Sequence, residues 1–252
     1  RMYDCKMINN VNNSNSSDQV VYLSSGSIVE RCLIDGNETY HQTVYLTGSS
    51  TISNSQITKS KSRSSHLIEI RDNSKMINCT VADNVSNSHT VCCYNTPQIL
   101  NSIIVGNKRS DKSETVYVNG ATIKYSMIEG GANGEGNIDG SKSSAAFADA
   151  SKGDYSLSGT SLCINAGTDV ADSLDLNKQV RKQSEAVDMG AIESSFTERA
   201  TVGSIIYVKA GSEGSGLSWD DALGEINQAV TLASTTGNRH DIWVAKGTYL
   251  GD

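Results

Sequence analysis

The sequence predicts an all-β fold: a right-handed parallel β-helix solenoid of about 24 residues per coil, with one amphipathic capping α-helix near the C-terminus. The main observation is a motif close to x-Cys/Ser-x-Ile/Val-x-x-Asn, which recurs at steps of 27, 23, 24, 23 and 24 residues. A fixed period in this range is typical of solenoids, in which each repeat is one coil stacked on the last. The copies of the motif contain Cys5, Cys32, Ser55, Cys79, Ser102 and Ser126.

Within residues 1–131, each coil contains three short patches in which apolar and polar residues alternate. Val21-Tyr22-Leu23 and Val44-Tyr45-Leu46 are examples. A period of two indicates a strand with one buried face, and the Gly, Asn and Ser between patches indicate turns. Three strands per coil fit a parallel β-helix. An α-helical solenoid is disfavoured by the alternation and by the abundance of Ser, Asn, Thr and Gly.

Equivalent residues of successive coils are expected to lie above one another, because neighbouring strands are about 4.8 Å apart. The Cys5–Ser126 column of small residues is expected where the interior is narrow. A corner column of Asn10, Asn37, Asn84 and Asn107 is expected to adopt left-handed backbone conformations and to form a ladder of amide hydrogen bonds. Three aliphatic columns are expected inside, with members Val21, Val44, Ile68, Val91 and Val116; Val29, Ile52, Met76, Ile99 and Ile123; and Met7, Ile34, Ile57, Val81, Ile104 and Ile128.

The six cysteines show no zinc-like Cys-x-x-Cys pair. Cys5 and Cys32 fall on neighbouring coils, close enough in principle for a disulfide. The simpler interpretation is that the cysteines are small buried thiols.

After Gly131 the repeat dissolves, and residues 132–196 are predicted to form irregular last coils. The loop 130–140 offers Asn133, Glu135 and Asp139 as candidate cation ligands. It lacks the regular acidic spacing of calcium loops, so calcium binding is not predicted.

Three segments in this region resemble a known C-terminal signature: Asp154-Tyr155-Ser156-Leu157, Ser161–Gly167 and Asp188–Glu193. They are similar to the end of pectin-lyase-like right-handed parallel β-helix proteins of Bacteroidota, of the choice-of-anchor Q domain type. The chain has Leu162 where that family usually has Pro. The middle of the signature matches more loosely, at Asp175-Leu176-Asn177 and Val180-Arg181. The resemblance implies a secreted or cell-surface protein.

Residues 204–252 resemble the N-terminal cap of the same family, with a strand, a helix and a second strand. We expect the helix to begin after Ser218 as N-cap, with Asp220 and Asp221 in its first turn, and to stop at Gly237. Its apolar face is predicted to contain Trp219, Ala222, Leu223, Ile226, Ala229, Val230 and Ala233.

Residues 197–203 are predicted to be a linker between these two signatures. A closing signature followed by an opening one predicts a tandem array or fibre of β-helix modules, of which this chain is one segment. The alternative is a single domain whose helix caps its own coils.

The composition of the chain disfavours some classes of binding partner. The net charge of −7 disfavours nucleic acid and anionic membranes. There is no apolar run of about 18 residues, so no membrane span is predicted.

The outward positions of the first strand form a candidate binding surface. Its column is Tyr22, Tyr45, Glu69, Cys92 and Tyr117. Since glycoside hydrolases use close pairs of carboxylates and this column has one, no catalytic residue and no cofactor are predicted. Tyr22, Tyr45, Glu69 and Tyr117 are instead predicted to bind glycan, because rigid amphipathic tyrosines are favoured in binding surfaces. The plainer alternative is that Tyr is simply a good exposed strand residue.

A polar corner column contains Gln19, Gln42, His66, His89 and Glu114. Two histidines with a nearby Glu could bind a metal. A plain polar stack is the preferred interpretation, so no metal site is predicted.

These observations predict a non-enzymatic, extracellular, structural or adhesin-like module at the cell surface. Its expected partners are other copies or neighbouring modules of the same protein, and polysaccharide. The alternative is a polysaccharide lyase or glycoside hydrolase whose active site lies outside this segment.

Overall fold

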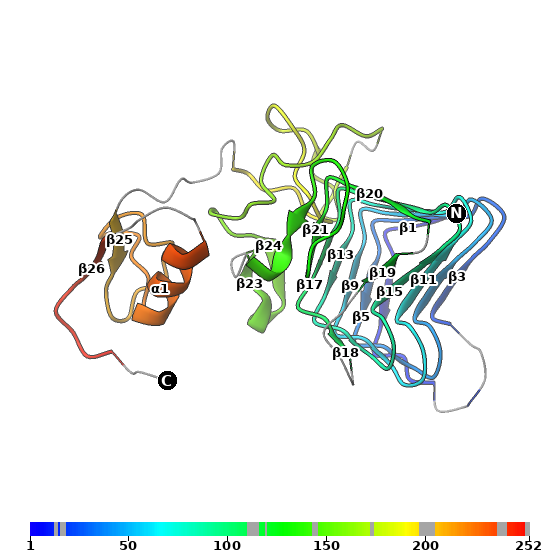
Figure 1. Ribbon diagram of the computed structural model, residues 1–252, viewed down its shortest axis with the longest axis horizontal. Helices are drawn as coiled ribbons and strands as arrows, with labels where there is room; N and C mark the ends of the chain where they lie inside the picture. Colours follow the sequence, from blue (N-terminus) through cyan, green and yellow to red (C-terminus); the bar gives the residue numbers. More distant parts are fainter. Residues whose placement is uncertain are drawn as a thin grey trace. The chain divides into compact units, whose positions relative to one another are not determined.

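The computed structural model describes residues 1–12, 15, 19–109, 116–118, 120–142, 146–171, 174–196, 205–235 and 241–249. The chain forms two compact units, one of residues 1–141 and 165–195 and one of residues 142–164 and 196–252. The first unit is a parallel β-solenoid of about five turns (Figure 1), which confirms the predicted fold class.

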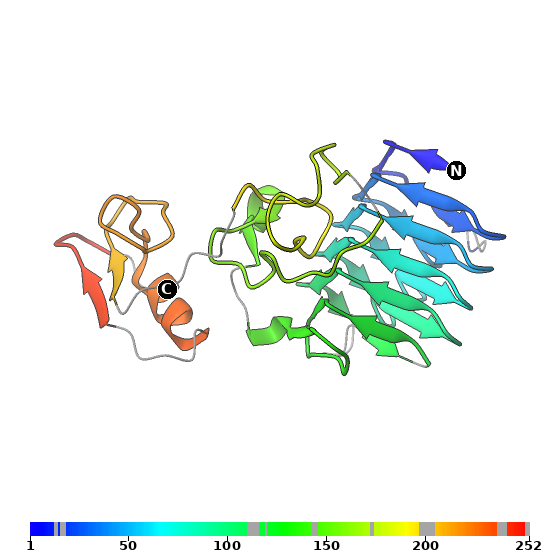
Figure 2. The same cartoon turned by 90° about the horizontal axis from the view of Figure 1, so that it is seen from above.

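Four parallel sheets form the sides of the solenoid, and successive coils lie one above the other (Figure 2). Sheet A contains β1 (Met2–Tyr3), β4 (Ile28–Glu30), β8 (Thr51–Ser53), β12 (Lys75–Ile77), β16 (Gln98–Leu100) and β20 (Thr122–Lys124). Sheet B contains β2 (Lys6–Ile8), β5 (Leu33–Asp35), β9 (Gln56–Thr58), β13 (Thr80–Ala82), β17 (Ile103–Val105), β21 (Met127–Ile128) and β22 (Ile138–Asp139). Sheet C contains β6 (Glu38–Thr39), β10 (Lys61–Ser62), β14 (Val85–Ser86) and β18 (Lys108–Arg109). Sheet D contains β3 (Val21–Leu23), β7 (Val44–Leu46), β11 (Ile68–Arg71), β15 (Val91–Tyr94) and β19 (Val116–Val118).

Sheet C corrects the prediction of three strands per coil. Its strands are two residues long, and a strand that short shows no alternation by which a sequence pattern could detect it. Its residues are also largely polar, such as Glu38 and Lys61.

The predicted aliphatic columns are confirmed by strand register. Val44 pairs with Val21 and Ile68, Met76 pairs with Ile52 and Ile99, and the third column pairs likewise through sheet B. Most members are fully buried. The core is therefore a set of stacks that run along the solenoid axis.

The corner between sheets A and B shows why the column of Cys and Ser is selected. Ser55 Oγ accepts the N–H of Cys32 on the preceding coil at 3.1 Å and donates to Ser53 O at 2.7 Å. The residue before each member has a positive φ, for example 48° at Asn54 and 51° at Asn78. The column thus both fills a narrow corner and ties adjacent turns together.

The predicted asparagine ladder is present at the corner between sheets B and C. Asn84 donates to Asn107 Oδ1 through its backbone N–H at 3.1 Å and through its side-chain amide at 2.9 Å. The expectation of a left-handed backbone at these asparagines is wrong. The positive φ lies one residue earlier, at Gly36, Asp83 and Gly106. The asparagines are selected for bonding between coils instead.

All six cysteines lie in the described part of the chain, and none forms a disulfide. Cys5 and Cys32 therefore do not form the bridge that their neighbouring coils would allow in principle.

Residues 165–195, which we call the closing segment, pack along the outer face of sheet B. The side-chain amide of Asn101 exchanges two hydrogen bonds with the backbone of Thr168, at 2.9 and 2.7 Å. Thr80 Oγ1 accepts the N–H of Ala191 at 3.0 Å, and Gly190 N–H donates to Asn101 O at 2.8 Å. As a result, β9 and β13 are buried on both faces.

A buried arginine holds the closing segment in its own fold. Arg181 donates to Gly190 O at 3.0 Å and to Asp188 O at 2.8 Å, and its guanidinium lies 3.4 Å from the Glu193 carboxylate. Both Glu193 oxygens accept the N–H of Asp188. Burial, followed by the nearby Asp188 carboxylate, raises the pKa of Glu193 to about 8, although Arg181 opposes the shift.

The second unit contains an antiparallel hairpin and a strand–helix–strand segment. The hairpin is β23 (Phe147–Asp149) and β24 (Asp154–Leu157), with the 3-10 turn η2 (Ala150–Lys152) between them; a further 3-10 turn, η1 (Gly140–Lys142), precedes it. The strand–helix–strand segment is β25 (Ile205–Val208), α1 (Ile226–Thr235) and β26 (Asp241–Val244), with β25 parallel to β26. This is the predicted element order. The predicted linker at 197–203 and stop at Gly237 lie outside the described residues.

The predicted start of the helix after Ser218 is wrong. Ser218 closes a single turn by accepting the N–H of Asp221. The Asp221 carboxylate accepts the N–H of Ser215 at 3.1 Å instead of capping a helix. The helix begins after Glu225, whose N–H donates to Gln228 Oε1 at 3.2 Å.

The apolar face of this helix is also narrower than predicted. Ala229 packs with Ile206 and Val208 in a small core, whereas Ile226 and Val230 are exposed. Among the described residues, no helix has the length and apolar character needed to cross a bilayer.

Candidate ligand-binding face

The outer face of sheet D carries the predicted binding column in register. Tyr22 pairs with Tyr45, Tyr45 with Glu69, Glu69 with Cys92, and Cys92 with Tyr117. The alternation in these strands turns Val and Leu inward and Tyr outward. Tyr22 and Tyr117 are 59% and 41% exposed.

The tyrosine rings on this face take part in a series of contacts that also includes residues outside the predicted column. Tyr22 and Tyr45 stack with ring centroids 5.4 Å apart and an interplanar angle of 4°. The Arg71 guanidinium lies 5.9 Å from the Tyr45 ring and 4.6 Å from the Tyr94 ring. Tyr94 and Tyr117 are 6.2 Å apart. We call Tyr22, Tyr45, Arg71, Tyr94 and Tyr117 the tyrosine–arginine ladder.

Arg71 and Tyr94 were not among the predicted site residues. Each lies two positions after a member of the column, Glu69 or Cys92, and residues two apart on a strand share a face. The signal was therefore in the sequence, one step further along two longer strands.

Glu69 lies deeper than the tyrosines of the predicted binding column. It is only 4% exposed. Its carboxylate accepts from Gln42 Nε2 at 2.6 Å and from Arg71 Nε at 2.5 Å. Glu69 therefore positions Arg71 between two tyrosine rings, and it lies beneath the surface that a ligand would meet.

The stacking also determines which parts of the tyrosines are available. The facing sides of the Tyr22 and Tyr45 rings cover each other, because the rings are nearly parallel. A ligand along this face would therefore meet ring edges and hydroxyl groups, with the Arg71 guanidinium between them.

The corner beside the ladder brings three further groups together. The His66 and His89 rings are 5.7 Å apart, and His89 lies 5.1 Å from the Tyr117 ring. Side-chain atoms of His66, His89 and Cys92 all lie within 4.8 Å of one another. Burial lowers the pKa of His66 and raises the pKa of the Cys92 thiol.

Part of the predicted polar corner stack is also present, since Gln19 Nε2 lies 3.5 Å from Gln42 Oε1. Glu114, the acidic member of the predicted column, lies outside the described residues. The structure therefore groups the two histidines with Cys92.

The loop 130–140 uses its carboxylates in contacts with protein donors. Glu135 accepts from the Tyr125 hydroxyl at 2.6 Å and from Lys124 at 2.9 Å, and these hydrogen bonds lower its pKa. Asp139 accepts from the N–H and the hydroxyl of Ser141. Glu135 and Asp139 thus accept hydrogen bonds from separate protein donors.

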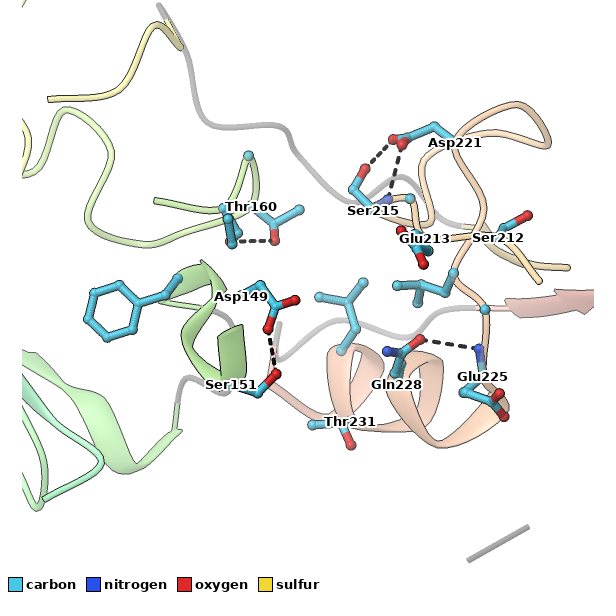
Figure 3. A pocket seen from close by; sticks show the side chains of 18 of the residues that line it. Asp149, Ser151, Thr160, Ser212, Glu213, Ser215, Asp221, Glu225, Gln228 and Thr231 are labelled. Atoms are coloured by element: carbon cyan, nitrogen blue, oxygen red, sulfur yellow. Dashed lines mark hydrogen bonds between the residues drawn. The ribbon is translucent and has the colours of Figure 1, made fainter. Parts of the chain in front are cut away.

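The second unit contains an open hollow of about 1150 Å³, lined by residues of the 147–160 and 211–232 regions (Figure 3). Its polar side chains serve local turns. Asp149 accepts from the Ser151 hydroxyl at 2.6 Å, which with the contact to Lys152 lowers the pKa of Asp149 to about 2. Asp221 accepts the Ser215 N–H, and Gln228 accepts the Glu225 N–H. These hydrogen bonds give the polar groups that line the hollow a structural role.

No protein-family model, no curated protein and no solved structure matches this chain. The resemblance to pectin-lyase-like proteins therefore depends on the sequence motifs alone, and inferences about function depend on the residues described above.

Proposed function

We propose that this chain is a non-enzymatic structural module of a surface-associated extracellular protein, and that it binds polysaccharide along the tyrosine–arginine ladder. The observation that carries the proposal is the ladder itself. It places a tyrosine or an arginine on every coil of sheet D, with neighbouring groups 4.6 to 6.2 Å apart.

The chemistry of the ladder suits a repeating, hydroxyl-rich polymer. Tyrosine supplies rigid amphipathic contact area, and its hydroxyl both donates and accepts hydrogen bonds. The Arg71 guanidinium adds donors that are already oriented by Glu69. A polymer that touches several coils at once can bind through many individually weak contacts.

The acidic groups of this face favour binding over hydrolysis. Glycoside hydrolysis uses two carboxylates about 5 to 10 Å apart. The described residues of the outward column contain one carboxylate, Glu69, and it is buried in an ion pair with Arg71. A lyase or hydrolase with its active site elsewhere in a longer protein is the alternative that the assay below separates.

The test is binding of the full chain to a panel of immobilised neutral and uronic polysaccharides. The variant Tyr22→Ala/Tyr45→Ala/Tyr117→Ala is expected to lose affinity at least about tenfold, because single aromatic contacts contribute about 0.5–1.5 kcal/mol each. The matched control is Tyr3→Ala, since Tyr3 is also exposed and also contacts an arginine, Arg31, away from the ladder.

Unchanged binding in the triple variant would remove this face as the binding site. Release of new reducing or unsaturated ends from any polysaccharide by the wild-type chain would instead support the enzymatic alternative.

A further inference from the structure

The corner of sheet D next to the ladder places three metal-binding side chains on two adjacent coils. His66 and His89 occupy the same position before β11 and β15, and the N–H of Leu67 donates to His89 O at 3.3 Å. Cys92 lies three residues after His89, on the outward side of β15. The coil period brings the two histidines together, and the strand brings Cys92 to them.

We propose that His66, His89 and Cys92 bind a single zinc-like transition-metal ion. Two imidazole nitrogens and one thiolate are the donors that Zn²⁺ and related borderline ions prefer over Ca²⁺ or Mg²⁺. Atoms within 4.8 Å of one another leave a central point about 2.8 Å from each. Shifts of about 0.5 Å for the sulfur and about 0.7 Å for the two nitrogens would reach Zn–S and Zn–N bond lengths.

The surroundings of His66 favour a ligand there. His66 Nδ1 is buried, and no hydrogen-bond partner for it is found in the described part of the chain. A buried polar atom without a partner destabilises the fold by about 1–3 kcal/mol, which coordination to a metal through Nδ1 would relieve.

The surroundings of Cys92 supply the supporting contacts of a metal site. Cys92 is buried, and the Tyr94 hydroxyl, on the same face of β15, is a hydrogen-bond donor to its sulfur. Donors of this kind stabilise a thiolate ligand. The metal would displace the thiol proton on binding.

Each His89 ring nitrogen has a contact in the structure, and metal binding would break the contact at the nitrogen that coordinates the ion. Arg109 Nη1 lies 3.5 Å from His89 Nε2, and Ser88 Oγ lies 3.4 Å from His89 Nδ1. Both distances are at the long limit of hydrogen bonding. Glu69, the register neighbour of Cys92, is paired with Arg71 and offsets the positive charge of that guanidinium near the site. Three protein ligands leave the fourth position of a tetrahedral ion open to water or to a ligand on the ladder.

The test uses the full chain, kept reduced and stripped of metal with a chelator. Titration with Co²⁺ is expected to give a thiolate-to-cobalt charge-transfer band that saturates at one equivalent. Zn²⁺ is expected to abolish this band by competition. Cys92→Ser should lose the band, and His66→Gln should weaken Zn²⁺ binding at least about a hundredfold, since even outer-shell changes cost 10–100-fold.

The matched control is Cys5→Ser, because the Cys5 column contains Ser at three other coils and so tolerates the change. It should bind both metals as the wild type does. A second measurement needs no variant: Zn²⁺ should protect Cys92 from alkylation, as mapped by mass spectrometry. The proposal is overturned if the wild-type chain binds no metal at one equivalent, if Cys92→Ser and His66→Gln bind as the wild type does, or if Zn²⁺ leaves Cys92 alkylation unchanged.

Discussion

The outer faces of sheets B and D are both built from short parallel strands, but they carry different kinds of side chain. On sheet B, the closing segment covers outward residues such as Thr80 and Ile103, which are fully buried. On sheet D, the outward residues are Tyr22, Tyr45 and other large groups that stack on one another. In a solenoid the inward side chains are dictated by the neighbouring coils, whereas the outward ones depend on what lies over them.

The two faces are also held by different kinds of interaction. Sheet B and the closing segment are joined by buried hydrogen bonds, such as the one from Ala191 N–H to Thr80 Oγ1. The sheet D ladder uses partly exposed ring and guanidinium contacts. Buried polar groups are costly to leave unpaired, whereas exposed contacts are individually weak. Variants on the sheet B side should therefore have the larger effects on stability.

The largest effect is expected from Arg181→Ala. The change leaves the buried carbonyls of Asp188 and Gly190 without their donor, and at pH 9, where Glu193 is ionised, it also leaves that carboxylate buried without its cation. At pH 9 we expect the free energy of unfolding of the first unit to fall by about 3–5 kcal/mol. Urea unfolding should be followed by far-UV circular dichroism, because Trp219 and Trp243 both lie in the second unit and their fluorescence would not follow the solenoid.

The control for this variant is Lys182→Ala. Lys182 pairs with Asp169, and both side chains are about half exposed or more. A loss of more than about 1 kcal/mol in the control, or less than that for Arg181→Ala, would contradict the contrast between the buried and exposed ion pairs.

A smaller loss is expected from Gly190→Ala. Gly190 has a φ of 98°, and an added Cβ would lie 2.8 Å from Ile103 Cδ1 and 3.0 Å from Thr80 Oγ1. Backbone strain and the tight contact together should cost about 3 kcal/mol. Gly26→Ala is the matched control, since Gly26 also has a positive φ but has no atom within 4 Å of the added Cβ. Equal losses in the same urea experiment would show that close packing against sheet B contributes nothing.

Glu193 should make the stability of the first unit depend on pH. Its folded-state pKa of about 8 lies above the ordinary value of 4.5, so the folded chain binds the extra proton between these values. This contribution to stability is therefore complete below about pH 4.5 and is lost as the pH rises through about 8. Glu193→Gln should show a flatter profile between pH 5 and 9 in urea unfolding. The same slope in both proteins would contradict the assignment.

The smallest effect is expected on the ladder. A double-mutant cycle of Arg71→Ala and Tyr94→Ala should give a coupling energy of about 0.5–1 kcal/mol, because the guanidinium lies over a half-buried ring at the surface. A cycle of Arg71→Ala with Tyr3→Ala provides the reference, since Tyr3 is not a member of the ladder. A coupling near zero for the first pair would show that the ladder contributes no stability and is available for a ligand at no structural cost.

Much of the solenoid could be predicted because its contacts recur at one period. The Cys and Ser column, the asparagine ladder and the three aliphatic columns all follow from residues one coil apart. The fourth strand escaped prediction because two polar residues carry no pattern. The start of the helix was wrong because Asp221, a good first-turn residue, is used by Ser215 in a loop.

The candidate site could be predicted only in part. Tyr22, Tyr45 and Tyr117 follow from the column, whereas Arg71 joins them because Glu69 turns its guanidinium toward Tyr94. A choice between side-chain orientations of this kind leaves no trace in residue spacing.

The sequence by itself determined the coil, its register and the inward columns, because each coil repeats the contacts of the one before it. Only the tertiary structure decided that the closing segment covers sheet B, that Arg181 and Glu193 meet inside it, and that His66, His89 and Cys92 converge beside the tyrosine–arginine ladder. These arrangements join residues whose separation is not the coil period, or depend on which way a side chain turns, so they arise only once the whole first unit has folded.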